Sequence, residues 1–372
     1  MTSEDFFERI QKQYHSRLPF VAYRKPNDHA IKALLQTNDV IYKVENYHEK
    51  GFVFAPFDDF EASILMPLKH SVAIETSYGN EDFKTSSNMN VSCHEEDKNN
   101  HIKLIEKGIK AIENHHFEKV VLSRQEIVSL SNVSFLDIFM NLINKYPLAF
   151  AYCWYHPKVG LWLGATPETL IKIEGHQFSM MALAGTQDYK GTLNVVWNEK
   201  EKKEQQIVTD FITENLEPFV ENIHVSEVET VKAGNLVHLK TMIKANLKID
   251  TYNLKQIVSV LHPTPAVCGL PKLPAKQFIL ENEGYKRTFY TGYLGELNYE
   301  TNIKPRTGHR NIENRAYSLS KKCTQLYVNL RCMQIIDQKA YVYVGGGITK
   351  ASNSEREWEE TVSKSKVIKS IL

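Results

Sequence analysis

Hydrophobic positions in the first hundred residues fall in short runs separated by polar turns. The opening residues 1–18 have the spacing of an amphipathic helix, and short apolar runs follow at 20–23, 51–57 and 63–68. The stretch 80–100 is rich in Asn, Ser, Glu and Lys, which predicts a surface loop or a linker. We therefore expect residues 1–100 to form a peripheral layer of the same fold as residues 101–372.

From residue 101 the spacing of apolar residues becomes more regular. Ile102, Ile105, Ile109 and Ile112 lie three or four apart, which predicts a helix over 101–114. The pattern then predicts strands over 119–130 and 149–155, two strands joined by a bend over 161–175, a further strand over 177–186, and helices over 135–145 and 198–220.

The last third of the chain continues this alternation. The pattern predicts helices over 253–261 and 275–283, a loop over 262–274, and strands over 223–232 and near 289–297, 324–336 and 340–344. The stretch 234–247 is also apolar. Strands outnumber helices and mostly follow one another through short turns. This order predicts an antiparallel α+β fold, not a series of βαβ units.

Composition excludes several classes of protein. A hydrophobic content of 42% and a charged content of 24% are ordinary for a soluble globular protein. The net charge of +1 gives no reason to expect nucleic acid or an anionic membrane as a partner. No apolar run approaches the 18 residues of a membrane span. Five cysteines without C-x-x-C spacing predict reduced thiols and a cytoplasmic location.

The C-terminal stretch 341–364 contains the first candidate site. A short β run is followed by Gly345, Gly346 and Gly347, where backbone can approach a ligand closely. Asn353 or Ser354 can cap a helix on which Glu357, Glu360 and Lys364 form one polar stripe. Two carboxylates one turn apart beside a glycine bend suit a hard cation such as Mg²⁺. A solvated helix face has the same pattern.

A second acidic pair lies on the helix expected over 198–220. Glu201 and Glu204 are one turn apart, and Glu204 leads into an apolar face. Two helices that each offer such a pair can hold one Mg²⁺. The alternative is again a Lys- and Glu-rich solvated helix.

Four further residues are candidates for catalysis or substrate binding. Lys119 stands at the start of an apolar strand, where burial would lower its pKa and suit it to act as a base. Glu168 follows the bend Gly-Ala-Thr-Pro and suits a protonated general acid. His238 lies in an apolar segment, and Arg331 interrupts a strand that looks buried, so that a substrate carboxylate could serve as its partner. Surface or core roles are the alternatives for each.

Nine blocks in collinear order together resemble the chorismate-utilising enzymes, namely the isochorismate, salicylate, anthranilate and aminodeoxychorismate synthases. The blocks are KVVLSR (119–124), GATPETL (164–170), LAGT (183–186), KEKKEQQIV (200–208), LVHLKT (236–241), LHPTPAVCGLPK (261–272), GYLGEL (292–297), LRC (330–332), and GGGIT (345–349) with EREWEETVSK (355–364). Gln205 departs from the histidine that is usual beside the metal-binding glutamate.

The resemblance implies two large antiparallel sheets packed together and flanked by helices, with residues 101–372 as the catalytic region. It implies a Mg²⁺-dependent reaction of chorismate, with Glu204 and Glu360 as metal ligands and Glu201 and Glu357 beside them. It places the general acid on Glu168. Substrate contacts fall on Gly185, Thr186, His238, Arg331, Gly345, Gly346, Gly347 and Lys364.

Lys119 distinguishes between members of the family. Those that use ammonia carry a neutral residue at this position, whereas those that use water carry lysine, which can remove a proton from water. We therefore expect isochorismate synthase activity, in a monomer that serves menaquinone or siderophore synthesis. Salicylate synthase, which goes on to eliminate pyruvate, and a catalytically inactive binding or scaffold protein remain the alternatives.

Overall fold

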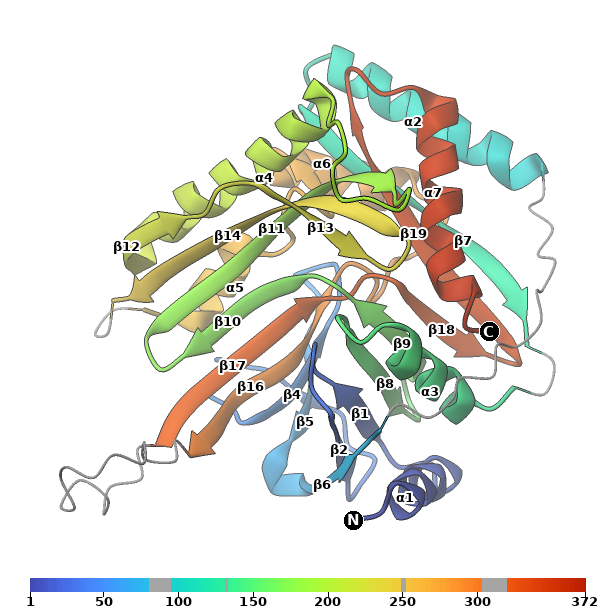
Figure 1. Cartoon of the computed structure of the whole chain (residues 1–372), viewed down its shortest axis with the longest axis vertical. Coiled ribbons are helices and arrows are strands. Elements are labelled where there is room, and N and C mark those ends of the chain that lie inside the picture. Colours follow the sequence, from blue (N-terminus) through green and yellow to red (C-terminus); the bar gives the residue numbers. More distant parts are fainter. Residues whose placement is uncertain (80–94, 131–132, 249–251, 303–319) are drawn as a thin grey trace.

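Two large antiparallel sheets pack against each other, with helices on their outer faces (Figure 1). The structure is a computed structural model that describes residues 1–79, 95–130, 133–248, 252–302 and 320–372. The strand pairings within these ranges are all antiparallel. The predicted α+β class with two packed sheets is confirmed.

The first sheet has nine strands in the order β15-β7-β19-β18-β9-β8-β1-β2-β6. Their bounds are β1 Phe20–Arg24, β2 Ala30–Gln36, β6 Ser71–Ser77, β7 Lys119–Ser129, β8 Phe150–His156, β9 Gly160–Thr166, β15 Gly269–Leu270, β18 Cys332–Ile336 and β19 Lys339–Thr349.

The second sheet has ten strands, nine in the order β12-β14-β11-β10-β17-β16-β4-β5-β3 and β13 paired with β14. Their bounds are β3 Tyr42–Lys43, β4 Gly51–Ala55, β5 Ile64–Pro67, β10 Thr169–Glu174, β11 Gln177–Asp188, β12 Val220–Val225, β13 Glu229–Ala233, β14 Leu236–Leu247, β16 Tyr293–Asn302 and β17 Ser320–Val328. Strands from the first hundred residues thus belong to both sheets.

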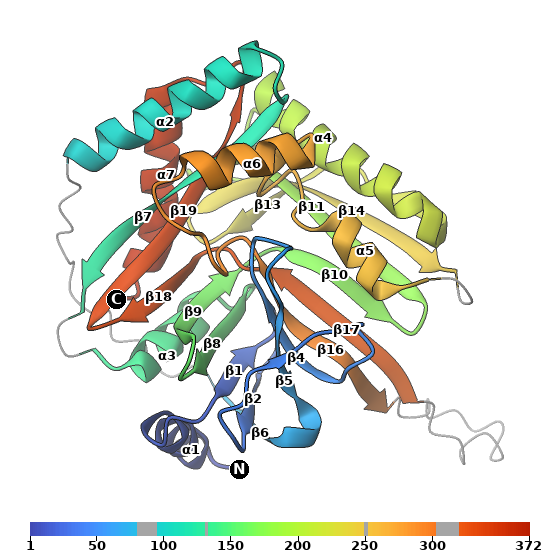
Figure 2. The same ribbon diagram turned by 180° about the vertical axis from the view of Figure 1, so that it is seen from behind.

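The helices cover the sheets in separate groups, as Figures 1 and 2 show from opposite sides. Their bounds are α1 Ser3–His15, α2 Glu95–Glu113, α3 Phe135–Lys145, α4 Glu199–Leu216, α5 Leu254–Leu261, α6 Lys272–Asn282 and α7 Ser354–Lys369, with short 3-10 turns at Leu68–His70 and Glu217–Phe219. Helices α4 and α5 pack on the second sheet, and α2 and α6 pack on β7 of the first.

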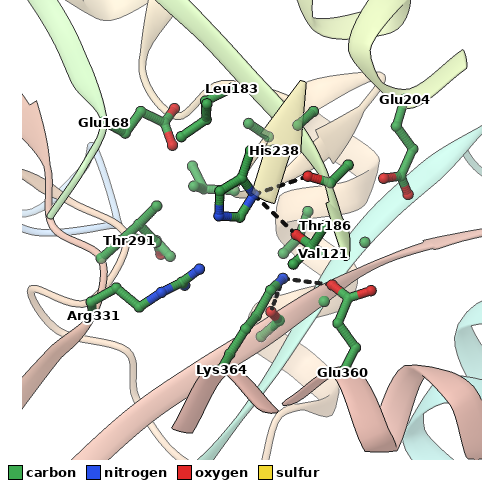
Figure 3. A pocket seen from close by; sticks show the side chains of 18 of the residues that line it. Val121, Glu168, Leu183, Thr186, Glu204, His238, Thr291, Arg331, Glu360 and Lys364 are labelled. Atoms are coloured by element: carbon green, nitrogen blue, oxygen red, sulfur yellow. Dashed lines mark hydrogen bonds and ion pairs between the residues drawn. The ribbon is translucent and has the colours of Figure 1, made fainter. Parts of the chain in front are cut away.

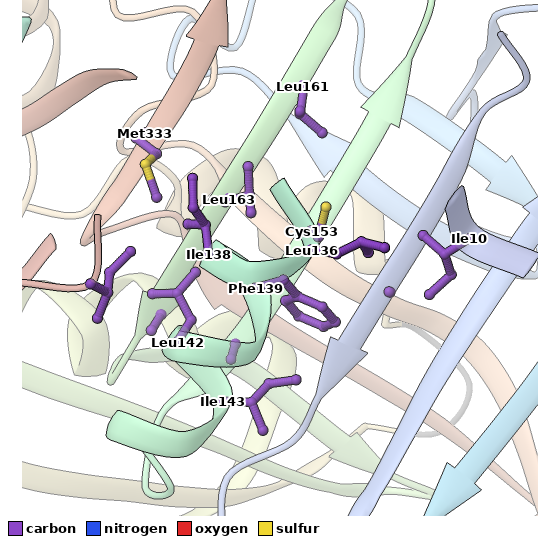
Figure 4. Packing of buried hydrophobic residues seen from close by; sticks show 14 of the residues in the cluster. Ile10, Leu136, Ile138, Phe139, Leu142, Ile143, Cys153, Leu161, Leu163 and Met333 are labelled. Atoms are coloured by element: carbon purple, nitrogen blue, oxygen red, sulfur yellow. The ribbon is translucent and has the colours of Figure 1, made fainter. Parts of the chain in front are cut away.

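Apolar spacing explains why these helices bury one face. In α3, Leu136, Phe139 and Ile143 point toward the first sheet and contribute to one hydrophobic cluster with its strands (Figure 4). Aromatic side chains fill much of the space between the two sheets, where Phe54 packs on both Trp154 and Phe289.

The structure corrects several expected boundaries. The loop predicted over 80–100 is wrong from residue 95, because α2 begins at Glu95; residues 80–94 lie outside the described residues. The single strands predicted over 223–232 and 324–336 are each two strands. Helix α6 begins at Lys272, three residues earlier than predicted.

Two corrections concern candidate site residues. Gly345, Gly346 and Gly347 do not form a bend, because β19 continues through them to Thr349 and stays paired with β7. Arg331 does not lie in a strand. It occupies the connection from β17 to β18, with a left-handed backbone at φ 48° that interrupts strand pairing.

Candidate active site

A small cavity of about 70 Å³ is lined by residues of both sheets and of the connections between their strands. Strands β7, β11 and β14 and helices α4 and α7 contribute side chains to it, and β19 contributes the backbone of its three glycines. Twelve of the fourteen residues singled out in the sequence line this cavity: Lys119, Glu168, Gly185, Thr186, Glu204, His238, Arg331, Gly345, Gly346, Gly347, Glu360 and Lys364. Glu201 and Glu357 do not line it.

Lys119 enters the cavity from the start of β7. Alternation along the strand turns Lys119 and Val121 toward the cavity, while Val120 and Leu122 pack in the cluster under α2 and α6. The Lys119 side chain is 2% exposed. Burial lowers the pKa of this amine, although the carboxylate of Glu204 opposes the shift. A larger fraction of Lys119 than of an exposed lysine is therefore uncharged.

Glu168 and Arg331 stand at two neighbouring crossovers between the sheets. The chain passes from β9 to β10 at Glu168 and from β17 back to β18 at Arg331. Because β9 pairs with β18 and β10 pairs with β17, these crossovers lie side by side. Backbone hydrogen bonds from Val328 to Glu168 and from Ala165 to Arg331 connect them.

The carboxyl group of Glu168 is held in its protonated form at neutral pH. Burial raises the pKa of Glu168 to about 8, against the lowering effects of Arg331 and Lys119. No hydrogen bond to this carboxyl group is formed by any residue that the structure describes, so its proton is available to a ligand in the cavity.

Three carboxylates gather over the glycines of β19. A Cβ added to Gly347 would lie 2.9 Å from Oε1 of Glu204, and one added to Gly346 would lie 3.8 Å from both Oε2 of Glu357 and Oε1 of Glu360. Because glycine has no side chain, Gly346 and Gly347 leave the space that these carboxylates occupy. Glu201 lies nearby, with its Cβ 3.1 Å from the position of a Cβ on Gly185.

Lysines neutralise part of this acidic cluster. Lys200 pairs with Glu357, and Lys364 donates to Oε1 of Glu360 at 2.6 Å and to the carbonyl of Gly345 (Figure 3). Burial acts to raise the pKa of Glu360, but the charges of Lys364 and Lys200 outweigh it and hold that pKa below its usual range. Burial raises the pKa of Glu357 despite the opposing charge of Lys200.

His238 presents an unpaired nitrogen. Its Nδ1 lies 2.9 Å from the carbonyl oxygen of Gly185 and 3.3 Å from Oγ1 of Thr186. A carbonyl only accepts, so Nδ1 carries the proton and Nε2 is a free acceptor. Burial and the charge of Arg331 lower the pKa of His238 to about 3, which keeps the ring neutral. Nε2 is buried without a partner among the described residues.

Arg331 lies across the cavity from the acidic cluster, on the same side as Glu168 (Figure 3). Its guanidinium forms no hydrogen bond or ion pair with any part of the chain that the structure describes. A guanidinium in such a site suits a carboxylate of a bound ligand.

Some residues of the site were not singled out in the sequence. Tyr290 and Thr291 line the cavity, but they precede the block 292–297 and belong to no acidic or glycine pattern. Lys200 stands at the start of the block 200–208, yet its pairing with Glu357 crosses 157 residues of sequence. Only the fold could reveal that pairing.

The donor atoms fit a hard divalent cation. Oε1 of Glu204, Oε2 of Glu357 and Oε2 of Glu201 are buried without hydrogen-bond partners among the described residues. Carboxylate oxygens are the ligands that Mg²⁺ prefers. Within the described ranges, no group of three or more His, Cys, Asp or Glu side chains is already gathered closely enough to hold a metal. Glu204 and Glu360 would hold such a cation, at a site where Lys200 and Lys364 now pair with carboxylates of the same cluster.

Comparisons with known proteins are consistent with this geometry. The chain is 28% identical over 281 residues to isochorismate synthase MenF of Pasteurella multocida, which is 72% of this chain and 60% of that protein. It is 27% identical over 256 residues to isochorismate synthase EntC of Escherichia coli strain K12, which is 66% of this chain and 59% of that protein. The matched segments thus span less than two thirds of these relatives.

Solved structures share the fold. MenF, the menaquinone-specific isochorismate synthase of Escherichia coli, superposes with a TM-score of 0.73 at 19% identity, covering 95% of this chain and 88% of that one. Anthranilate synthase component I of Streptococcus pneumoniae superposes with a TM-score of 0.64 at 18% identity, covering 95% and 92%.

The family itself is identified by sequence profiles. A profile described as chorismate binding enzyme matches residues 51–304, more than half of the chain, and a second profile of the same description matches residues 316–370. Together they cover every residue that lines the cavity. The chain belongs to the chorismate-binding enzymes.

Proposed function

We propose that this protein is an isochorismate synthase, which converts chorismate to isochorismate. The observation that carries the proposal is that one cavity contains a buried amine, Lys119, and a carboxyl group that keeps its proton, Glu168. An acid and a base with opposite pKa shifts are the arrangement that general acid–base catalysis requires.

In the proposed mechanism, neutral Lys119 takes a proton from a water molecule as its oxygen attacks C2 of chorismate. The ring double bonds shift, and the C–O bond at C4 breaks. Glu168 gives its proton to the departing C4 hydroxyl, which leaves as water. One water enters and one leaves, so the net reaction is an isomerisation.

The remaining residues orient the substrate. Arg331 and the free Nε2 of His238 suit a carboxylate and a hydroxyl respectively. Gly185 and Thr186 hold His238, and Gly345 holds the ammonium of Lys364. Glu204 and Glu360 would hold Mg²⁺, with Glu201 and Glu357 beside them. Bound Mg²⁺ would supply positive charge to the C1 carboxylate of the substrate.

Salicylate synthase is the second candidate, because the same first step precedes elimination of pyruvate. Incubation with chorismate and Mg²⁺, followed by mass and fluorescence analysis of the products, separates the two. Isochorismate without pyruvate supports our proposal, whereas one pyruvate for each chorismate consumed supports the alternative. An absence of turnover supports an inactive binding or scaffold protein.

Lys119→Ala and Glu168→Gln test the assigned roles. A well-placed acid or base contributes about 10²–10⁴-fold, so we expect each variant to lose turnover while its fold stays intact. Lys98→Ala and Glu174→Gln are matched controls, since both residues form ion pairs away from the cavity. A near-normal rate in Lys119→Ala or Glu168→Gln would refute the role of that residue.

The product would enter menaquinone or siderophore synthesis, and we propose a cytoplasmic monomer. Among the described helices, none is long and apolar enough to cross a membrane. Gel filtration combined with light scattering tests the monomeric state.

A further inference from the structure

A second cavity adjoins the inner cavity that contains Lys119 and Glu168. This outer chamber has a volume of about 360 Å³ against about 70 Å³ for the inner cavity. The two share Pro167, Leu183 and Arg331 as lining residues. Arg331 therefore stands in the wall between them.

Segments from both sheets form the outer chamber. The connection from α3 to β8 contributes Tyr146 and its neighbours, and the β13–β14 hairpin contributes Val231 to Gly234. The hairpin comes close to Tyr146, because a Cβ added to Gly234 would lie 3.3 Å from Cε1 of the ring.

The charge of the outer chamber has one sign. Lys145, Lys232, Lys240 and Arg331 line it, and no acidic residue does so among the described residues. Lys240 is paired with Glu229, but Lys232 lies over the ring of Tyr189 at 4.0 Å. The other walls are largely apolar. Cations along an apolar-walled passage concentrate a small anion and guide it inward.

We propose that the outer chamber is the route by which the anionic substrate reaches the inner cavity, with Arg331 receiving its carboxylate at the boundary. This inference rests on the proposed function, in which the substrate carries two carboxylates. The volumes agree with this route, since the substrate passes through the larger outer chamber before it reaches the smaller inner cavity, where the reaction takes place.

Met181→Trp tests the route, with Met181→Leu as its control. Met181 lines the outer chamber but not the inner cavity, and its side chain is partly exposed, so a larger ring narrows the passage. We expect kcat/KM for chorismate to fall at least tenfold. A narrowed route slows entry and exit alike, so the Kd for chorismate, measured by equilibrium dialysis in the Lys119→Ala background, should change less than twofold.

The outcomes separate the two proposals. If wild-type protein forms isochorismate and the folded Met181→Trp variant keeps kcat/KM within twofold, the route is wrong and the function stands. A rise in Kd that matches the loss in kcat/KM also overturns the route, because it shows a damaged binding site. If wild-type protein forms no isochorismate, the proposed function fails on its own.

A charge reversal provides a second test. Lys232→Glu should lower kcat/KM severalfold at low salt, and the loss should disappear near 1 M salt, where the Debye length is about 3 Å. Lys43→Glu is the matched control, since Lys43 is exposed on β3 and lines neither cavity. Equal effects of the two reversals would contradict guidance by the outer chamber.

Discussion

Glu168 and Arg331 occupy adjacent crossovers between the two sheets, although 162 residues separate them in the sequence. Pairing of β9 with β18 and of β10 with β17 fixes both connections against each other. The fold thus holds a buried carboxyl group and a guanidinium on one side of the cavity, across from the acidic cluster (Figure 3).

The first prediction concerns pH. The general acid must keep its proton, and the pKa of Glu168 is raised to about 8. We therefore expect kcat/KM to fall about tenfold per pH unit above pH 8. Lys119 must lose its proton, and burial lowers its pKa, so activity should rise toward neutral pH. The rising and falling limbs of the pH profile report apparent pKa values of Lys119 and Glu168 acting as an interacting pair. A constant kcat/KM from pH 7 to 10 would contradict the assignment.

Stability should respond to the same group. The pKa of Glu168 in the folded state lies above its ordinary value of about 4.5, so the folded state binds more protons than the unfolded state between these values. Its contribution to stability is fully present below about pH 4.5 and is lost as the pH rises through about 8. Glu168→Gln should weaken this decline in denaturant-unfolding measurements. An unchanged pH slope would argue against the raised pKa.

A second prediction concerns the space above β19. In Gly347→Ala the new Cβ would lie 2.9 Å from Oε1 of Glu204 and 3.2 Å from Cε of Lys119, so both side chains must move. We expect activity to fall at least tenfold with little change in Tm. Gly346→Ala is the control, because its new Cβ meets nothing closer than 3.8 Å. Equal losses in the two variants would show that the approach to Glu204 is not the cause.

A third prediction concerns Lys200, whose ammonium group would compete with Mg²⁺ for the carboxylate of Glu357. Lys200→Met leaves the buried carboxylate of Glu357 without its partner, which should cost about 3 kcal/mol of stability without Mg²⁺. Mg²⁺ should raise the Tm of this variant at lower concentrations than it does for wild-type protein, because Lys200 no longer has to be displaced from Glu357. Lys202→Met is the control, since Lys202 pairs with the exposed Glu199. An identical Mg²⁺ dependence in Lys200→Met and wild type would refute the competition.

A fourth prediction concerns Gln205, the departure from the family pattern. Its Nε2 donates to the carbonyl of Ala182 at 3.1 Å and to Oγ1 of Thr241 at 2.9 Å, which fastens α4 to β11 and β14 next to Glu204. Gln205→Leu should cost about 1–3 kcal/mol, because it leaves buried acceptors unpaired. It should also weaken Mg²⁺ binding in calorimetry.

Gln205→His is the conservative counterpart and should restore both stability and Mg²⁺ affinity, since a ring nitrogen can donate in place of the amide. Full Mg²⁺ affinity in Gln205→Leu would show that Gln205 stabilises the fold without positioning Glu204.

The sequence predicted local structure well where periodicity was strong. Helix α3 and the start of β7 lie where the apolar spacing placed them, and Asn353 caps α7 through its side chain. Predictions were wrong where pairing with another strand decides whether a segment is extended or forms a turn. Gly345 to Gly347 looked like a bend, because glycine disfavours strands when considered alone, yet pairing with β7 keeps them extended.

The sequence by itself determined the fold class, the family resemblance and the identity of the candidate acid, base and acidic residues, because these depend on residue type and spacing. Tertiary structure alone decided that Lys119 is buried, that the two acidic helix faces stand over neighbouring glycines of β19, and that Lys200 meets Glu357. Burial and long-range pairing depend on which strands become neighbours. Strand neighbours are chosen by the packing of the whole chain, which no local pattern contains.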